Sequence, residues 1–332
     1  MGSNPSLSAN FSFLLFSSPF SFFLRPPCPS WIAASSSQRL SLRCDLVTPS
    51  AEYLGRCAKL LKAVSSQETS IQQAADWFAQ TILAGRMVHC FGSGHSRILV
   101  EEMWPRYGSF PGFNPIVELS LSFHNLVVGA NGQRQAMFLE NVTGLAERIL
   151  RNYDLSPLDS ALVISSSGCN RVPIEMAEEF QRRGVRVVAI ISRLHSQASR
   201  SARDDGRKLQ DFADLVFDTG APVGDAMVKI RGLDTPVAPG STVGGCLLVN
   251  CIKAEVALRL TAAGAPPRVL TAAALVGADR ARELFESAYD EHAHRLAKLY
   301  EHVGPPKVAA GMPRAKSISG GKARRRARPD PR

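Results

Sequence analysis

Apolar residues recur every three to four positions between residues 51 and 84, and short continuous apolar runs follow further along the chain. The first pattern predicts two amphipathic helices, or one helix broken near Ser65 and Ser66. The runs predict β-strands at 87–91, 115–119, 161–165, 185–191 and 214–218, with a short run at 268–270 that would add only an edge strand. Helical periodicity predicts helices at 97–106, 133–152, 172–183 and 241–260.

The order of these elements indicates the fold class. The strand runs are continuously apolar rather than alternating, as expected when helices cover both faces of a sheet. Regular alternation of strand and helix favours parallel strands joined by crossovers. We therefore predict an α/β fold with a doubly wound parallel sheet, in which a ligand would lie beyond the carboxyl ends of the strands.

Two short loops rich in glycine and serine follow predicted strands. They read FGSGHSR at 91–97 and ISSSGCNR at 164–171, and each precedes a predicted helix. A helix N-terminus offers unpaired amides and a partial positive charge, and glycine lets the backbone approach an oxyanion. The hydroxyls of Ser165, Ser166 and Ser167 would add neutral donors. A phosphorylated small molecule is therefore the first ligand to consider.

The positive charge of the chain lies in its terminal segments. The formal net charge is +10 over 332 residues, of which residues 1–44 carry +3 and residues 305–332 carry +8. The remaining body is near neutral, which argues against a specific nucleic-acid groove. The basic run at 320–328 could touch nucleic acid or an anionic surface without specificity, although such like-charge runs are more typical of solvated tails.

The first residues do not read as part of the fold. Residues 1–45 are rich in Ser, Phe and Pro and lack acidic residues except Asp45 at the end, and their apolar stretch at 11–24 is interrupted by Pro19. Such a segment resembles an organellar, plastid-like transit peptide, with a cytoplasmic location as the alternative. It is too short to span a membrane. We expect a targeting-like or disordered extension at 1–45, one folded domain at 46–304 and a disordered basic tail at 305–332.

No pattern in the chain predicts a metal site or a redox cofactor. The seven cysteines form no CxxC pair, so buried free thiols and a reducing compartment are expected. His89, Cys90 and His95 lack the spacing of metal ligands. The GxG in the first loop lacks the third glycine of a dinucleotide fingerprint, which leaves nucleotide binding as a weak alternative.

Taken together, several blocks resemble the sugar isomerase (SIS) domain, a flavodoxin-like module that binds phosphosugars. The resemblance covers about residues 50–270, and the blocks are FGSGHS with Glu101 and Glu102 downstream, 164–177, 220–226 and 238–256. It is closest to bacterial SIS proteins described only as phosphosugar-binding, and more distant from sedoheptulose-7-phosphate isomerase and N-acetylmuramic acid 6-phosphate etherase. The resemblance implies a homodimer with the early helices between subunits.

The resemblance also implies a set of ligand-binding positions. Ser165, Ser167 and Asn170 would lie at the phosphate, helped by backbone amides near Gly168. Ser241 and Thr242 would close the phosphate pocket or cap the last helix, since Ser and Thr are common at such caps. The remaining substrate-binding positions belong to the two loops and are Gly92, Ser93, Gly94, Ser96 and Ser166.

Proton transfer on a sugar would need a carboxylate or an imidazole near the reacting carbon. Glu102, Glu101 and His95 are the predicted catalytic residues. Alternatively, the two acids could equally be surface residues, and His95 could hydrogen-bond a backbone group of its own loop. The chain has no histidine on its late helix, where heptose-phosphate isomerases of this family carry one; Asn250 and Glu255 are the polar residues there. Two functions stay open: a sugar-phosphate isomerase or lyase, and a non-catalytic phosphosugar sensor.

Overall fold

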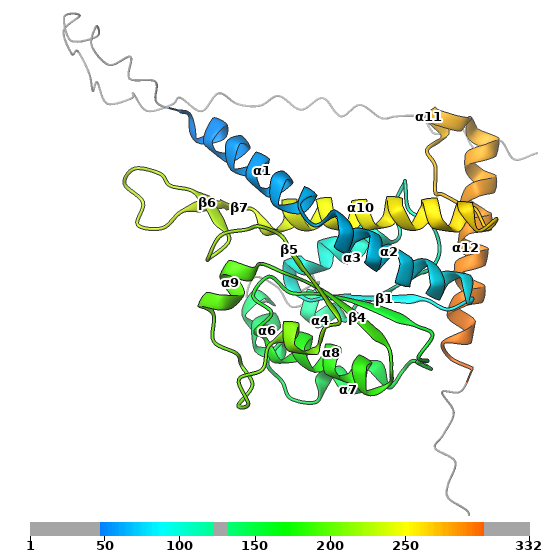
Figure 1. Ribbon diagram of the computed structural model, residues 1–332, viewed down its shortest axis with the longest axis horizontal. Coiled ribbons are helices and arrows are strands. Elements are labelled where there is room, and N and C mark those ends of the chain that lie inside the picture. The colour runs from blue at the N-terminus through cyan, green and yellow to red at the C-terminus, as the bar shows by residue number, and fades with distance from the viewer. Residues whose placement is uncertain (1–46, 123–131, 302–332) are drawn as a thin grey trace, which may run out of the picture. The chain divides into compact units, whose positions relative to one another are not determined.

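The computed structural model describes residues 47–122 and 132–301. Its centre is a sheet of five parallel strands in the order β2-β1-β3-β4-β5 (Figure 1). The strands are β1 (Val88–Gly92), β2 (Phe113–Ile116), β3 (Ser160–Ile164), β4 (Arg186–Ile191) and β5 (Leu215–Asp218). The chain runs outward from β1 to β2 and then crosses back to β3, which leaves a topological switch point between β1 and β3. This confirms the predicted doubly wound α/β sheet.

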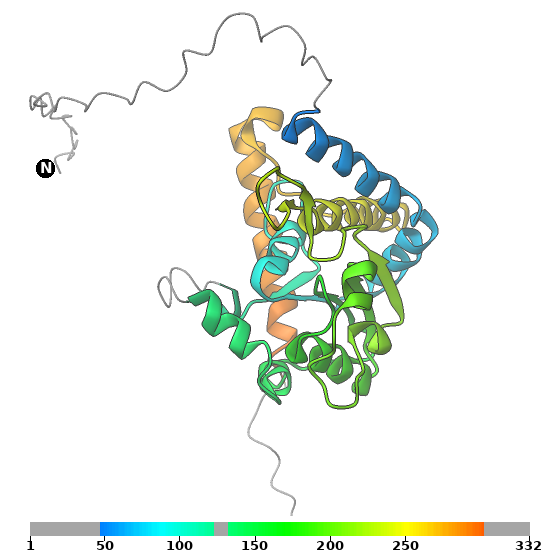
Figure 2. The same ribbon diagram turned by 90° about the vertical axis from the view of Figure 1, so that its left-hand side faces the viewer.

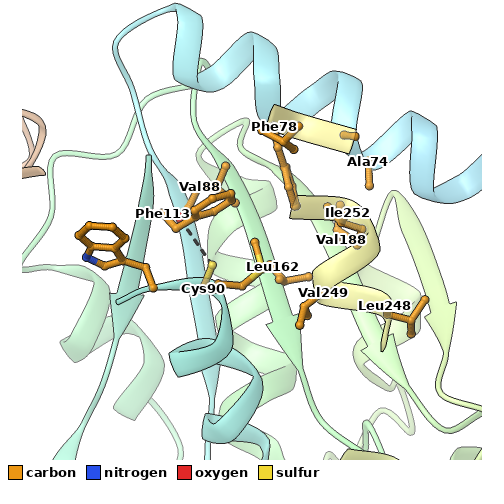
Figure 3. Packing of buried hydrophobic residues seen from close by; sticks show 14 of the residues in the cluster. Ala74, Phe78, Val88, Cys90, Phe113, Leu162, Val188, Leu248, Val249 and Ile252 are labelled. Carbon is orange, nitrogen blue, oxygen red and sulfur yellow. Dashed lines mark hydrogen bonds between the residues drawn. The ribbon is translucent and has the colours of Figure 1, made fainter. Parts of the chain in front are cut away.

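Helices cover both faces of the sheet. On one face lie α2 (Glu68–Leu83), α3 (Arg97–Met103) and α10 (Ser241–Ala262), with α1 (Pro49–Ser65) packed against α10. On the other face lie α7 (Leu145–Leu150) and α8 (Arg171–Arg182) (Figures 1 and 2). Successive strand residues point to opposite faces. Leu162 packs under α2 and α10 (Figure 3), while Val163 belongs to the core on the side of α8. Because both faces are covered, the strands have no polar side, which explains their continuous apolar runs.

Local sequence signals account for several helix ends. Thr48 caps α1 by accepting a hydrogen bond from Ala51 N, with Pro49 at the first helical position. The break predicted near Ser65 and Ser66 is present, because α1 ends at Ser65 and α2 begins at Glu68. The helix predicted to reach residue 106 stops at Met103, since Pro105 cannot continue it.

One predicted helix is wrong. The periodic segment 133–152 folds as two helices, α6 (Gly132–Leu139) and α7, with Gly144 at a φ of +79° between them. Glycine adopts this left-handed conformation without the steric cost that other residues bear. The break brings Glu140 against the start of α8, where its main-chain oxygen accepts a hydrogen bond from Val172 N.

The chain after β4 holds elements that the apolar pattern did not indicate. The polar segment after β4 contains α9 (Arg193–Ala198). Residues 268–270 form no strand, although Leu270 exchanges main-chain hydrogen bonds with Gly108 and Ser109. A hairpin of β6 (Ala226–Val228) and β7 (Val237–Pro239) precedes α10. Further elements are α4 (Leu119–Ser122), the short helices η1 (Gly94–Ser96) and η3 (Leu209–Phe212), α11 (Ala273–Val276) and α12 (Ala278–Lys298).

Within residues 47–122 and 132–301, none of the helices is long and apolar enough to cross a membrane. The extension at 1–45 and the tail at 305–332 lie outside the described residues. The predicted division of the chain and its predicted location therefore stay predictions.

Candidate functional site

A cavity of about 420 Å³ lies at the carboxyl edge of the sheet. Figure 2 is turned so that this edge faces the viewer. Both glycine and serine loops reach the cavity, and so does the start of α10. The predicted residues that line it are Ser93, Gly94, His95, Ser96, Ser165, Ser166, Ser167, Asn170, Ser241 and Thr242. The structure thus brings together, at the switch point, residues that lie up to 149 positions apart in the sequence.

Gly92 and Gly168 do not line the cavity, and they shape its loops instead. A methyl group on Gly92 would lie 2.7 Å from Ser96 O, which is too close for any side chain. Gly168 has a φ of +62°, and its amide donates to Ser165 O and Ser165 Oγ. Gly92 is required because the chain passes too close for a side chain, and Gly168 because of its left-handed backbone; neither presents a side chain to a ligand.

The three serines of the second loop keep hydroxyl hydrogens for a ligand. Ser165 Oγ accepts from Gly168 N, and Ser167 Oγ accepts from Cys169 N, each at 3.2 Å. Among the described residues, Ser166 Oγ has no hydrogen-bond partner. Because a hydroxyl carries one donor and two acceptor sites, accepting an amide leaves its hydrogen unused. The loop can therefore offer the hydroxyl hydrogens of Ser165 and Ser167 to an oxyanion, while the Ser166 hydroxyl oxygen is buried.

The amides at the start of α8 are already engaged. Arg171 N donates to Asn141 Oδ1, Val172 N donates to Glu140 O, and Pro173 has no amide hydrogen. The next amide, that of Ile174, bonds Asn170 O. The expectation that first-turn amides of this helix face a ligand is therefore wrong. An anion at this end of the cavity would rely on the serine loop.

An internal carboxylate occupies the start of α10. Asp225, at a φ of +69°, accepts hydrogen bonds from Gly240 N, Ser241 N and Ser241 Oγ at 3.1, 2.6 and 2.6 Å. Asp225 therefore does the capping that the sequence assigned to Ser241 or Thr242. Since the Ser241 hydroxyl donates to Asp225, it can only accept a hydrogen bond from a ligand, while Thr242 also lines the cavity.

Sequence reasoning missed several polar residues of the cavity. They are Gln133, Glu140, His195, Thr219 and Asp225. His195 Nδ1 accepts from Gly224 N at 2.8 Å, so the neutral ring carries its proton on Nε2. Its place shortly after β4, at the same sheet edge, could have pointed to it. Glu140 gave no such signal, because the pattern placed it inside one continuous helix.

Charge is unevenly spread among the described residues that line the cavity. They include two carboxylates, Glu140 and Asp225, and two imidazoles, but neither Lys nor Arg. Nowhere in the described ranges do three His, Cys, Asp or Glu side chains come together in an arrangement that could hold a metal ion. Ligand recognition in this cavity would thus depend on hydroxyl, amide and imidazole hydrogen bonds.

Glu101 and Glu102 lie outside the cavity of their own chain. Both line a second hollow of about 640 Å³, whose apolar wall includes Phe285 and Tyr289. Glu101 pairs with Arg97; Glu102 pairs with Arg106 and accepts from Asn250 Nδ2 at 2.8 Å. Burial alone would raise the pKa of Glu102, but the bonds from Asn250 and Arg106 lower it below its usual range. The third predicted catalytic residue, His95, does line the cavity.

Comparisons with known proteins agree with this architecture. Residues 52–192 match the SIS domain family. A UPF0309 protein of Listeria monocytogenes serotype 4b is 31% identical over 240 residues, covering 72% of this chain and 95% of the relative. A UPF0309 protein of Halalkalibacterium halodurans is 32% identical over 220 residues, covering 66% of this chain and 88% of the relative.

Two solved structures are similar at lower identity. The phosphoheptose isomerase GmhA from Neisseria gonorrhoeae has a TM-score of 0.40 and 14% identity, covering 64% of this chain and 96% of its own. The Vibrio vulnificus NanR protein complexed with ManNAc-6P also has a TM-score of 0.40 and 14% identity, covering 74% of this chain and 70% of its own. On the strength of the family match and the bacterial relatives, the chain is an SIS-domain protein and belongs to the UPF0309 family.

Proposed function

We propose that this protein binds a phosphosugar in the cavity at the carboxyl edge of the sheet. The observation that carries the proposal is the convergence of both predicted loops on one cavity. The phosphate would accept hydrogen bonds from Ser165, Ser166 and Ser167. The sugar hydroxyls would lie toward Ser93, Ser96 and Thr242. A volume of about 420 Å³ is within the usual range for small-molecule sites.

A catalytic function is the further part of this proposal. The protein would act as a sugar-phosphate isomerase or as an amino-sugar-phosphate lyase, moving a proton without a metal or a redox cofactor. A cavity holding carboxylate and imidazole groups beside the phosphate end supports this. The alternative is a sensor that binds the same ligand without turnover, which the absence of histidine from α10 favours.

Ligand-induced stabilisation tests the binding proposal. Hexose, heptose and N-acetylhexosamine phosphates at millimolar concentration should raise the melting temperature more than inorganic phosphate does, because stabilisation grows with [L]/Kd. Replacing Ser166 and Ser167 together with alanine should weaken affinity by about 100-fold or more, since hydrogen bonds to charged groups contribute about 1.5–3 kcal/mol each. Thermal denaturation over a ligand titration measures both effects.

Ser70→Ala is a suitable control, because Ser70 lies on α2 and does not line the cavity. It should leave the ligand response unchanged. If sugar phosphates never exceed inorganic phosphate, or if NAD or ATP protects more than any sugar phosphate, the binding proposal is wrong. If the ligand raises the melting temperature of the double serine variant as much as that of the wild type, the phosphate does not bind at this loop.

We also propose that the protein forms a homodimer through its early helices. Leu54 and Leu61 of α1 are 68% and 55% exposed and lie seven positions apart, on one side of the helix. A second copy of α1 would remove these leucines from water. Light scattering should give twice the 35.9 kDa mass of one chain. A monomer at the concentration of the ligand assays would contradict the proposal.

A further inference from the structure

We propose that Glu140, rather than Glu101 or Glu102, is the carboxylate that moves a proton on the bound sugar. The inference rests on the proposed function and adds to it the group that would do the chemistry. It starts from the break between α6 and α7, which the sequence pattern did not reveal.

The position of Glu140 is fixed from both sides. Its main-chain oxygen accepts from Val172 N at 2.8 Å, and its carboxylate accepts from the Asn170 side-chain amide. A methyl group built on Gly94 would lie 3.5 Å from Glu140 Oε1. The carboxylate therefore sits between the first loop and the second loop, the two segments that converge on the cavity. Only 9% of the residue is exposed.

The other acids near the sheet edge have different hydrogen-bond partners or lie in a different hollow. Asp225 is held by three hydrogen bonds that cap α10. Glu102 is bonded to Arg106 and Asn250 in a separate hollow. Glu140 lines the cavity beside the serine loop, and the hydrogen bond from Asn170 orients its carboxylate there. A base must lie within hydrogen-bond reach of the proton it takes, so geometry favours Glu140.

The proposed isomerisation balances without a further reactant. With an open-chain aldose phosphate bound, the carboxylate takes the proton from C2, the C–H electron pair forms the C1=C2 bond, and O1 becomes an enolate oxygen. The proton of the C2 hydroxyl then passes to O1. The carboxylic acid returns its proton to C1 as the carbonyl forms at C2. No oxidant or reductant takes part, and the carboxylate is regenerated.

Exchange with solvent deuterium tests this assignment without knowledge of the product. Wild-type protein is incubated in D2O with each sugar phosphate that stabilises it, and proton NMR follows the loss of the C2–H signal. Glu140→Gln should slow exchange by at least about 100-fold, the usual scale of general acid–base catalysis. Its stabilisation by the same sugar phosphates should persist. Glu140→Asp, which keeps the carboxylate but draws it back, should retain measurable exchange.

Two further variants complete the experiment. Glu286→Gln removes an exposed acid of α12 and should exchange like wild type. If Glu102→Gln loses exchange while Glu140→Gln keeps it, the assignment to Glu140 is overturned. It is also overturned if wild type is stabilised by sugar phosphates yet exchanges none of them. If no sugar phosphate stabilises wild type, the proposed function itself has failed.

Discussion

Replacing Gly244 with alanine should lower the free energy of unfolding by about 3 kcal/mol or more, and the melting temperature by roughly 10 °C. Gly244 is buried where α10 crosses the end of β5, and an added methyl group would lie 2.1 Å from Thr219 O. The main chain at Thr219 cannot move away easily, because Thr219 N donates a hydrogen bond to Ile191 O at 2.8 Å. Urea denaturation followed by circular dichroism measures the loss.

Gly55→Ala provides the matched control. Gly55 lies on the exposed face of α1, and no atom lies within 4 Å of the position its methyl group would take. Alanine is the better helix former, so this change should stabilise the protein by up to about 1 kcal/mol. If both substitutions shift stability in the same direction and by the same amount, close packing of α10 on Thr219 does not constrain Gly244.

Replacing Asp159 with asparagine should cost about 3–5 kcal/mol, because it leaves a cation without its partner in a largely buried position. Asp159 is 2% exposed and binds Arg86 through both carboxylate oxygens, at 2.9 and 2.7 Å. It also accepts from Ser156 N at 2.8 Å, and His89 Nε2 lies 3.6 Å away. Chemical denaturation near neutral pH measures the change.

The same residue predicts an acid-sensitive part of the stability. Burial alone would raise the pKa of Asp159, but the neighbouring His89 and the bonds from Arg86 lower it from 3.8 to about 2. Because the folded-state pKa lies below the unfolded one, the stabilisation is complete above pH 3.8 and is lost as the pH falls toward about 2. By linkage it amounts to about 2 kcal/mol.

Urea denaturation at a series of pH values separates this contribution from others. Asp159→Asn should flatten the acid limb of the stability profile relative to wild type. Asp204→Asn is the control, since the side chain of Asp204 is fully exposed. An acid limb in Asp159→Asn as steep as that of wild type would show that other carboxylates account for it.

The sheet could be predicted from sequence because each strand is buried on both faces. Val187 and Val188 pack on opposite helical layers, so the run that holds them is apolar throughout and easily found. The carboxyl-edge rule then placed both loops correctly. α12 was not predicted, because only Ala288 of its residues is buried and its apolar pattern is correspondingly thin.

The candidate site was predictable only where loop composition marks it. Ser165 to Ser167 follow a strand directly, and all three residues line the cavity. Glu140 and Asp225 escaped notice because their positions depend on a helix break and on a left-handed residue before a hairpin. Glu102 attracted attention by its spacing from the first loop, yet α3 turns it toward Arg106 and Asn250.

The carboxylate of Asp225 has a consequence for how a ligand can lie. A long helix such as α10 would otherwise present its positive pole to the cavity and compete with the serines for any anion. Asp225 cancels that pole from within. With that pole offset, a dianionic ester bound as proposed would depend on the serine loop, and not on the start of α10, for its hydrogen bonds.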